Sequence, residues 1–164
     1  MSTGIDRRKF LLLAPVMGLA LAARAEPAAE IPLATDLQAD GRLSRKSKAP
    51  LVILFSLPRC PYCEIVRRSH LGPMLRDPRQ AGRAIIRQID IGVDHAVISF
   101  AGERTTHANI ARAHDVHAAP VVAFWDGNGK AAAESLKGML LPDFYGAYLD
   151  SAIDAARGRL AARD

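Results

Sequence analysis

Residues 50–66 read "PLVILFSLPRCPYCEIV" and contain both cysteines of the chain, Cys60 and Cys63. The first part of this stretch, residues 50–57, is an almost continuous apolar run after a proline. A run of this kind lacks the alternation of a half-exposed strand and is typical of a central strand buried on both faces. The sequence therefore places the cysteine pair directly after a buried strand.

A helix is expected to begin at the cysteine pair. Pro61 suits the first helical position, because its φ is fixed and it has no N–H to leave unpaired. We expect this helix to run from Cys60 to about His70 and to be broken or kinked at Gly72-Pro73. Cys60 would then lie at the helix cap and Cys63 in the first turn.

Two cysteines at this spacing could form a structural staple, half of a zinc site or a redox pair. A staple over so short a loop restricts the unfolded chain little. A zinc site needs at least two further ligands. His114 and His117 could serve, but they lie at an expected helix end, where histidines are common as surface residues. The other histidines are isolated in the sequence, and surface or loop positions are expected for them: His70, His95 and His107.

A redox pair fits the placement best. The N-terminus of a helix offers partial positive charge and free N–H groups, and both stabilise a thiolate, which is the attacking species. Arg59 adds a neighbouring positive charge, while Pro61 leaves the N–H donors to Tyr62 and Cys63. We expect Cys60, on the exposed edge, to form a mixed disulfide with a client and the more buried Cys63 to resolve it.

The remaining segments predict a small mixed sheet covered by helices. Hydrophobic patterning and turn residues indicate an extended lead-in over 26–33 and a short helix near 36–46, which Gly41 weakens. A strand over 83–92 and a helix over 103–115, capped by Thr105 or Thr106, follow the cysteine helix. The last elements are a strand over 119–126, a hairpin turn over 126–129, a strand near 131–137 and a helix over 142–160 whose apolar stripe packs on the core.

The chain resembles the thioredoxin-like superfamily through "LPRCPYC" at 57–63 and "AAPVVAFW" at 118–125. The resemblance implies an α/β thioredoxin-like fold, with a central mixed sheet of four to five strands, a C-terminal antiparallel hairpin and flanking helices. It also implies a cis peptide bond between Ala119 and Pro120 beside the cysteines. The backbone of Ala119 would pair with an incoming substrate strand, and Pro120 and Tyr62 would contact the substrate.

The chain departs from thioredoxin itself in the motif and in the strand before it. Pro-Tyr stands between the cysteines where thioredoxin has Gly-Pro, and Leu54 stands at the position of thioredoxin's buried acid. The proton relay is therefore expected to differ or to run through solvent, with Glu64 as a candidate. "CPYC" is also the motif of glutaredoxins, but those proteins are shorter and cytoplasmic.

Residues 1–25 resemble an export signal. A basic cluster, Arg7-Arg8-Lys9, precedes an apolar run over 10–23, and Ala23-Arg24-Ala25 offers a signal peptidase site. The arginine pair favours the twin-arginine route, although a general secretion signal also fits. The apolar run is short of the roughly 20 residues that span a bilayer, so an uncleaved membrane anchor is the alternative. We expect a periplasmic protein whose residues 26–164 form one thioredoxin-like domain.

The charge pattern gives no sign of a nucleic-acid partner. The chain of 164 residues has a net charge of +5, and residues 1–25 carry three of these positive charges. The remaining basic residues are scattered among acidic ones, without the basic patch or stripe of a nucleic-acid binder.

We expect a thiol–disulfide oxidoreductase that exchanges disulfides with protein clients through Cys60 and Cys63, as a monomer without organic cofactor or metal. Reduction of clients is favoured over oxidation, because Tyr62 cannot supply the cation that DsbA-type oxidants carry in the motif, although Arg59 could supply part of that effect. A reductase would take its electrons from a membrane dithiol relay. The alternatives are a dithiol oxidase and a thioredoxin-like module that binds a partner or delivers a metal without turnover.

Overall fold

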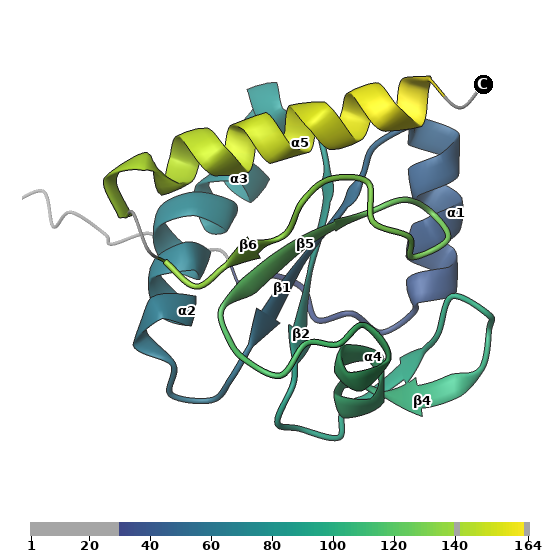
Figure 1. Ribbon diagram of the computed structural model, residues 1–164. Helices are drawn as coiled ribbons and strands as arrows, with labels where there is room; N and C mark the ends of the chain where they lie inside the picture. Colours follow the sequence, from purple (N-terminus) through teal and green to yellow (C-terminus); the bar gives the residue numbers. More distant parts are fainter. Residues whose placement is uncertain (1–29, 140–141, 163–164) are drawn as a thin grey trace, which may run out of the picture.

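The computed structural model describes residues 30–139 and 142–162, and Figure 1 shows their arrangement. The strands are β1 (Leu51–Ser56), β2 (Ile85–Asp90), β3 (Ala96–Ile98), β4 (Arg104–Thr106), β5 (Val121–Trp125) and β6 (Leu136–Lys137). The α-helices are α1 (Leu37–Ser47), α2 (Pro61–Ile65), α3 (Gly72–Arg76), α4 (His107–Ala113) and α5 (Tyr145–Ala161). A π-helical turn, η1 (Val66–Leu71), joins α2 to α3, and two short 3₁₀ turns are η2 (Pro78–Gln80) and η3 (Pro142–Phe144).

The central sheet is mixed, with the strand order β2-β1-β5-β6. β1 runs parallel to β2 and antiparallel to β5, and β5 pairs antiparallel with β6. At the outer edge of β2, Leu33 forms one further parallel bridge with Gln88, so part of the lead-in segment adds to the sheet. The expected thioredoxin-like fold with a central mixed sheet is confirmed.

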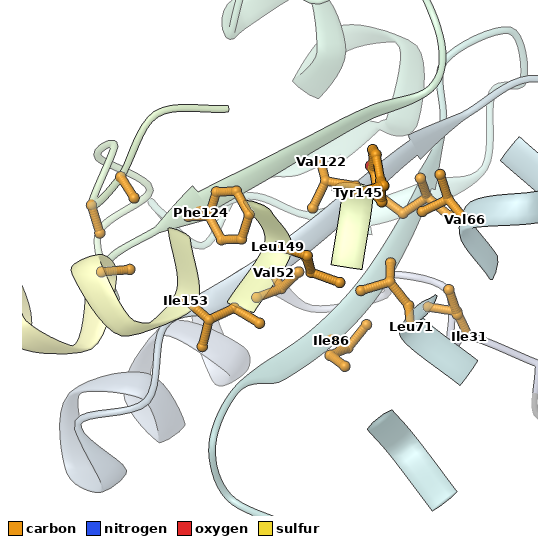
Figure 2. Close-up of a cluster of buried hydrophobic side chains, with 14 residues drawn as sticks. Ile31, Val52, Val66, Leu71, Ile86, Val122, Phe124, Tyr145, Leu149 and Ile153 are labelled. Atoms are coloured by element: carbon orange, nitrogen blue, oxygen red, sulfur yellow. The ribbon is translucent and has the colours of Figure 1, made fainter. Parts of the chain in front are cut away.

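The central strand β1 separates two hydrophobic cores, and all six of its residues are buried. Val52 and Leu54 face one core, which α5 covers with Leu149 and Ile153 (Figures 1 and 2). The alternate residues of β1, Leu51, Ile53 and Phe55, face the second core. This core also contains Leu37 of α1 and Ile110 of α4. Because successive side chains of a strand point to opposite faces, the continuous apolar run predicted from the sequence is what two covered faces require.

The helical path that follows the cysteines extends beyond its predicted end near His70 and continues through Gly72-Pro73 to Arg76. The N–H of Gly72 donates to the carbonyl of Arg67, five residues back, in the π-helical turn η1. Pro73 then occupies the first turn of α3, where a missing N–H breaks no bond. The wider turn before the proline lets the helical path continue to Arg76.

Two further predicted elements have the wrong extent. Residues 103–106 do not begin a helix, because Arg104–Thr106 pair with Ala96–Ile98 in a separate two-stranded hairpin. The helix starts at His107, and its cap is Thr106, whose hydroxyl accepts a hydrogen bond from the N–H of Asn109. The strand expected near 131–137 is reduced to β6 and an isolated bridge between Ala131 and Trp125.

The last helix follows its prediction closely. Four residues of its apolar stripe are buried: Tyr145, Leu149, Ile153 and Ala156. Ala152 and Leu160, also in the stripe, are partly buried and pack against the same core. Tyr148, also in that stripe, is exposed. The predicted signal segment, residues 1–25, lies outside the described residues. Among the helices that the structure describes, none is long and apolar enough to cross a membrane.

Gly41 lies where α1 meets the turn after β5. Because of this contact, we expect replacement of Gly41 by alanine to destabilise the protein, against the usual order of helix propensities. Alanine is normally better than glycine inside a helix by about 1 kcal/mol. A Cβ at Gly41, however, would overlap the carbonyl oxygen of Gly127. Gly41→Ala should therefore lower the free energy of unfolding by about 1–3 kcal/mol. The measurement is urea unfolding followed by circular dichroism.

Gly158 in α5 is the matched control for Gly41. A Cβ there meets nothing within 4 Å, so Gly158→Ala should raise the free energy of unfolding by about 0.5–1 kcal/mol. If Gly41→Ala stabilises the protein as much as Gly158→Ala does, the result would contradict the close approach of α1 to the turn at Gly127.

Candidate active site

Cys60 and Cys63 form a disulfide at the start of α2, with their Cα atoms 5.3 Å apart. Cys60 is the N-cap residue of this helix, and its Sγ accepts a hydrogen bond from the N–H of Cys63 at 3.1 Å. Pro61 occupies the first turn, as predicted, where its missing N–H leaves no unpaired donor. The sulfur of Cys60 therefore lies at the positive end of the helical segment.

The two cysteines differ in accessibility. Cys63 is fully buried, whereas Cys60 is partly exposed. The exposed sulfur can be reached by a client disulfide, and the buried one can attack only the sulfur beside it. The attacking role of Cys60 and the resolving role of Cys63 stay predictions, and both require this difference in accessibility.

The tight turn from β1 to α2 places Cys60 at the N-cap of α2. Arg59 has a φ of 58°, in the left-handed region that few residues other than glycine adopt. Its side chain points to solvent, and within the described part of the chain it makes no hydrogen bond or ion pair. Arg59 is therefore close to Cys60 in the chain but supplies an exposed, screened charge.

The peptide bond between Ala119 and Pro120 is cis, as the resemblance implied. Pro120 precedes Val121, which pairs with Phe55 near the end of β1. The carbonyl of Pro120 accepts a hydrogen bond from Gly138 at the end of β6. This loop therefore lies at the edge of the sheet from which the cysteine turn emerges. The substrate contacts assigned to Ala119, Pro120 and the exposed Tyr62 stay predictions.

A pocket of about 510 Å³ opens beside Cys60. Its lining comes from the β1–α2 turn, from α2 and η1, and from the end of β2 with the loop that follows, and it includes Arg59, Pro61, Glu64, Arg67, Gln88, Asp90 and His95. Cys63 is not among its lining residues. The pocket therefore reaches Cys60 and not Cys63.

Arg67 organises one wall of this pocket. Its guanidinium donates hydrogen bonds to Ser56 Oγ at 3.1 Å and to Gln88 Oε1 at 3.0 Å, and it pairs with Glu64. Glu64 also pairs with Arg68. Leu54, at the position of thioredoxin's buried acid, is fully buried in the core. Glu64, the candidate proton relay, is thus held by two arginines.

The lining of the pocket also includes an acid and a histidine, Asp90 and His95, which no sequence motif connects. Asp90 ends β2, and its Oδ2 lies 3.7 Å from His95 Nε2. Its Oδ1 accepts a hydrogen bond from Gln88 Nε2 at 2.8 Å. A continuous polar chain therefore runs from Arg67 through Gln88 and Asp90 to His95.

His107 anchors both members of that pair, and its expected surface position is wrong because its side chain is fully buried. Its Nδ1 accepts a hydrogen bond from the backbone N–H of Asp90 at 3.0 Å. Its Nε2 contacts the carbonyl of Ala34 at 2.7 Å. The backbone N–H of His107 donates a hydrogen bond to the carbonyl of His95 at 2.9 Å. An acceptor role for Nδ1 and a donor role for Nε2 require the neutral ring.

The candidate metal ligands do not converge. His114 is half-buried and stacks on Trp125 with ring centroids 4.0 Å apart, whereas His117 is exposed and pairs with Asp115. In residues 30–139 and 142–162, no group of three or more histidine, cysteine or acidic side chains could hold a metal ion.

A family model described as a thioredoxin-like domain matches residues 37–153. The chain belongs to the thioredoxin-like domain family. The matched segment contains the cysteine pair, the cis-proline and the first half of α5. This thioredoxin-like fold with its Cys-x-x-Cys pair is that of a thiol–disulfide oxidoreductase.

Solved structures with a similar fold include three bacterial or archaeal examples. A point mutant of thioredoxin from Halobacterium salinarum NRC-1 is 15% identical over 78% of this chain and 96% of its own, with a TM-score of 0.47. The oxidised DsbD C-terminal domain from Neisseria meningitidis is 18% identical over 73% and 98%, with a TM-score of 0.48. A thioredoxin-like protein from Clostridium perfringens is 17% identical over 85% and 91%, with a TM-score of 0.46. No curated protein sequence matches the chain significantly, and these structures are too distant to assign it a substrate.

The buried histidines predict loss of stability in mild acid. Burial lowers the pKa of His107, His114 and His70. The unfolded state therefore binds more protons than the folded state below the ordinary histidine pKa of about 6.5, and the free energy of unfolding falls as the pH drops through that value. His107→Gln should flatten this pH dependence by up to about 1.4 kcal/mol per pH unit. Urea unfolding between about pH 7.5 and 5.5 measures the slope.

A His107→Gln protein with the full wild-type slope would contradict the neutral, doubly hydrogen-bonded state of His107.

Proposed function

We propose that this protein is a periplasmic reductase of protein disulfides, recharged by a membrane dithiol relay. The observation that carries the proposal is the asymmetry of the cysteine pair. Cys60 is partly exposed at a helix cap and opens on a pocket, while Cys63 is fully buried behind it. This is the arrangement that a two-step exchange through a mixed disulfide requires.

The weak stabilisation of a Cys60 thiolate supports the reducing direction. Strongly oxidising pairs have a reduced form that is stabilised, as in DsbA. Here the described neighbours give Cys60 one N–H hydrogen bond, from Cys63. The two nearby arginines contribute little, because Arg59 is exposed and Arg67 is neutralised by Glu64. A dithiol without a strongly favoured thiolate gives its electrons away more readily.

Protein clients suit the surface around Cys60 better than small disulfides do. Three large apolar side chains near the cysteines are exposed to solvent: Leu57, Tyr62 and Ile65. Apolar side chains gathered beside a reactive group are typical of a protein contact surface. Ala119, beside the cis-proline, is partly exposed and leaves its backbone within reach of an extended client segment.

The periplasmic location rests on the sequence of residues 1–25. The arginine pair, the apolar run and the Ala-Arg-Ala site together fit an export signal. A periplasmic reductase must receive electrons from the cytoplasm through the membrane, so the proposal includes a membrane dithiol partner.

Reduction of insulin tests the proposal. The reduced wild-type protein should accelerate the dithiothreitol-driven precipitation of insulin chains, and Cys60→Ser should return the rate to the uncatalysed value. Cys63→Ser should also stop turnover but accumulate a mixed disulfide between Cys60 and insulin, because the resolving thiol is missing. Mass spectrometry of the trapped complex identifies the sulfur involved.

Two outcomes would contradict this assignment. A wild-type protein that leaves insulin intact while oxidising a reduced, unfolded protein rapidly would be a dithiol oxidase. Partner binding that survives both serine substitutions, without any reduction by the wild type, would indicate a binding module.

A further inference from the structure

A dithiol that reduces a client must move two protons as well as two electrons. Cys60 and Cys63 begin as thiols, and the client begins as a disulfide. At the end, Cys60 and Cys63 share a disulfide and the client carries two thiols, so both thiol protons have passed to the client. A group beside Cys60 that accepts and returns a proton would assist the first of these transfers.

We propose that His95, oriented by Asp90, exchanges this proton with Cys60 and the leaving sulfur of the client. His95, Asp90 and Cys60 line one pocket. The inference rests on the proposed role of Cys60 as the attacking sulfur. It assigns proton transfer to a loop residue after β2, since the core position inside β1 carries Leu54.

The other charged groups of the pocket are less suited than His95 to exchanging this proton. Arg59 and Arg67 stay protonated in proteins. Both carboxylate oxygens of Glu64 are already engaged, Oε2 by Arg67 and Oε1 by Arg68, so neither is left to face Cys60. Histidine, in contrast, changes its charge between about pH 5 and 8.

The pair is held in place from three directions. The carboxylate of Asp90 is fixed by Gln88, which is itself fixed by Arg67. The backbone of Asp90 and that of His95 are both hydrogen-bonded to His107. The rings of His95 and His107 meet edge to face, with centroids 5.3 Å apart. Because the hydrogen bonds of His107 keep it neutral, it adds no positive charge against a protonated His95.

The proposed step is balanced within the pocket. His95 takes the proton of the Cys60 thiol, and the thiolate attacks one client sulfur. The client S–S bond breaks as the bond between Cys60 and the client forms, and the departing sulfur carries the electron pair. His95 then returns its proton to that sulfur. Asp90 acts as a positioning residue, since its carboxylate faces the imidazolium but receives no proton.

The choice of disulfide gives a selective test. An alkyl thiolate is a poor leaving group, with a thiol pKa near about 8.5, and gains from protonation. A dipyridyl disulfide releases a thione that needs no proton on sulfur. Single-turnover oxidation of the reduced protein by oxidised glutathione can be followed by rapid acid quenching and alkylation of the remaining thiols, and oxidation by dipyridyl disulfide can be followed through thione absorbance.

His95→Gln should slow the reaction with oxidised glutathione by about tenfold or more near pH 7, and should change the dipyridyl rate far less. The deficit should shrink toward about pH 9, because an imidazole side chain changes its charge between about pH 5 and 8 and has no proton to donate above that range. Asp90→Asn should give a smaller loss with the same selectivity. His117→Gln, at an exposed position paired with Asp115, should match the wild type with both disulfides.

Chemical rescue separates proton transfer from a structural role. His95 is about half-exposed, so His95→Ala should keep the wild-type circular dichroism spectrum, and added imidazole should restore part of its rate with oxidised glutathione. Equal losses with both disulfides, an unchanged pH profile or an absence of rescue would each overturn the inference. If the wild type itself reacts with neither disulfide, the proposed function fails rather than the role of His95.

Discussion

The position of the reactive sulfur depends on the burial of β1 on both faces. The six residues of this strand are packed between two hydrophobic cores and hydrogen-bonded to β2 on one side and β5 on the other. The strand cannot slip by one residue without exchanging the two sets of apolar side chains. Its end at Ser56 is therefore fixed, and the turn through Arg59 delivers Cys60 to the cap of α2 in one place.

The same register brings the second group of functional residues to that edge of the sheet. Because β1 and β2 are parallel, Ser56 lies opposite Asp90, and both strands end together. Arg67 and Gln88 then connect the helix behind the cysteines to the carboxylate of Asp90. His107 ties the same region to the lead-in segment through Ala34. The stability of this edge and the chemistry of the pocket thus depend on one set of hydrogen bonds.

Local patterns were enough to predict the elements that carry the cysteines. The continuous apolar run, Pro61 and the helical stripe of the last helix each reflect short-range rules, and the structure confirms them. The cis bond before Pro120 followed from a family resemblance. The continuation of the helical path from His70 to Arg76 was missed because a π-helical turn depends on packing that neighbouring residues do not reveal. The His95–Asp90–His107 cluster could not be predicted in the same way. His107 lies 17 residues from Asp90 and 73 from Ala34 in the chain, so its hydrogen bonds exist only after the sheet and α4 have come together.

The central claim is that Cys60 and Cys63 form a cycling dithiol whose electrons flow toward clients. The most direct measurement is the reduction potential of the pair, obtained by equilibrating the protein with dithiothreitol or glutathione redox buffers and quantifying both forms. We predict a value near that of thioredoxin, about −270 mV, because few groups stabilise the reduced form. A value near that of DsbA, about −120 mV, would contradict this claim, since such a pair would oxidise its clients.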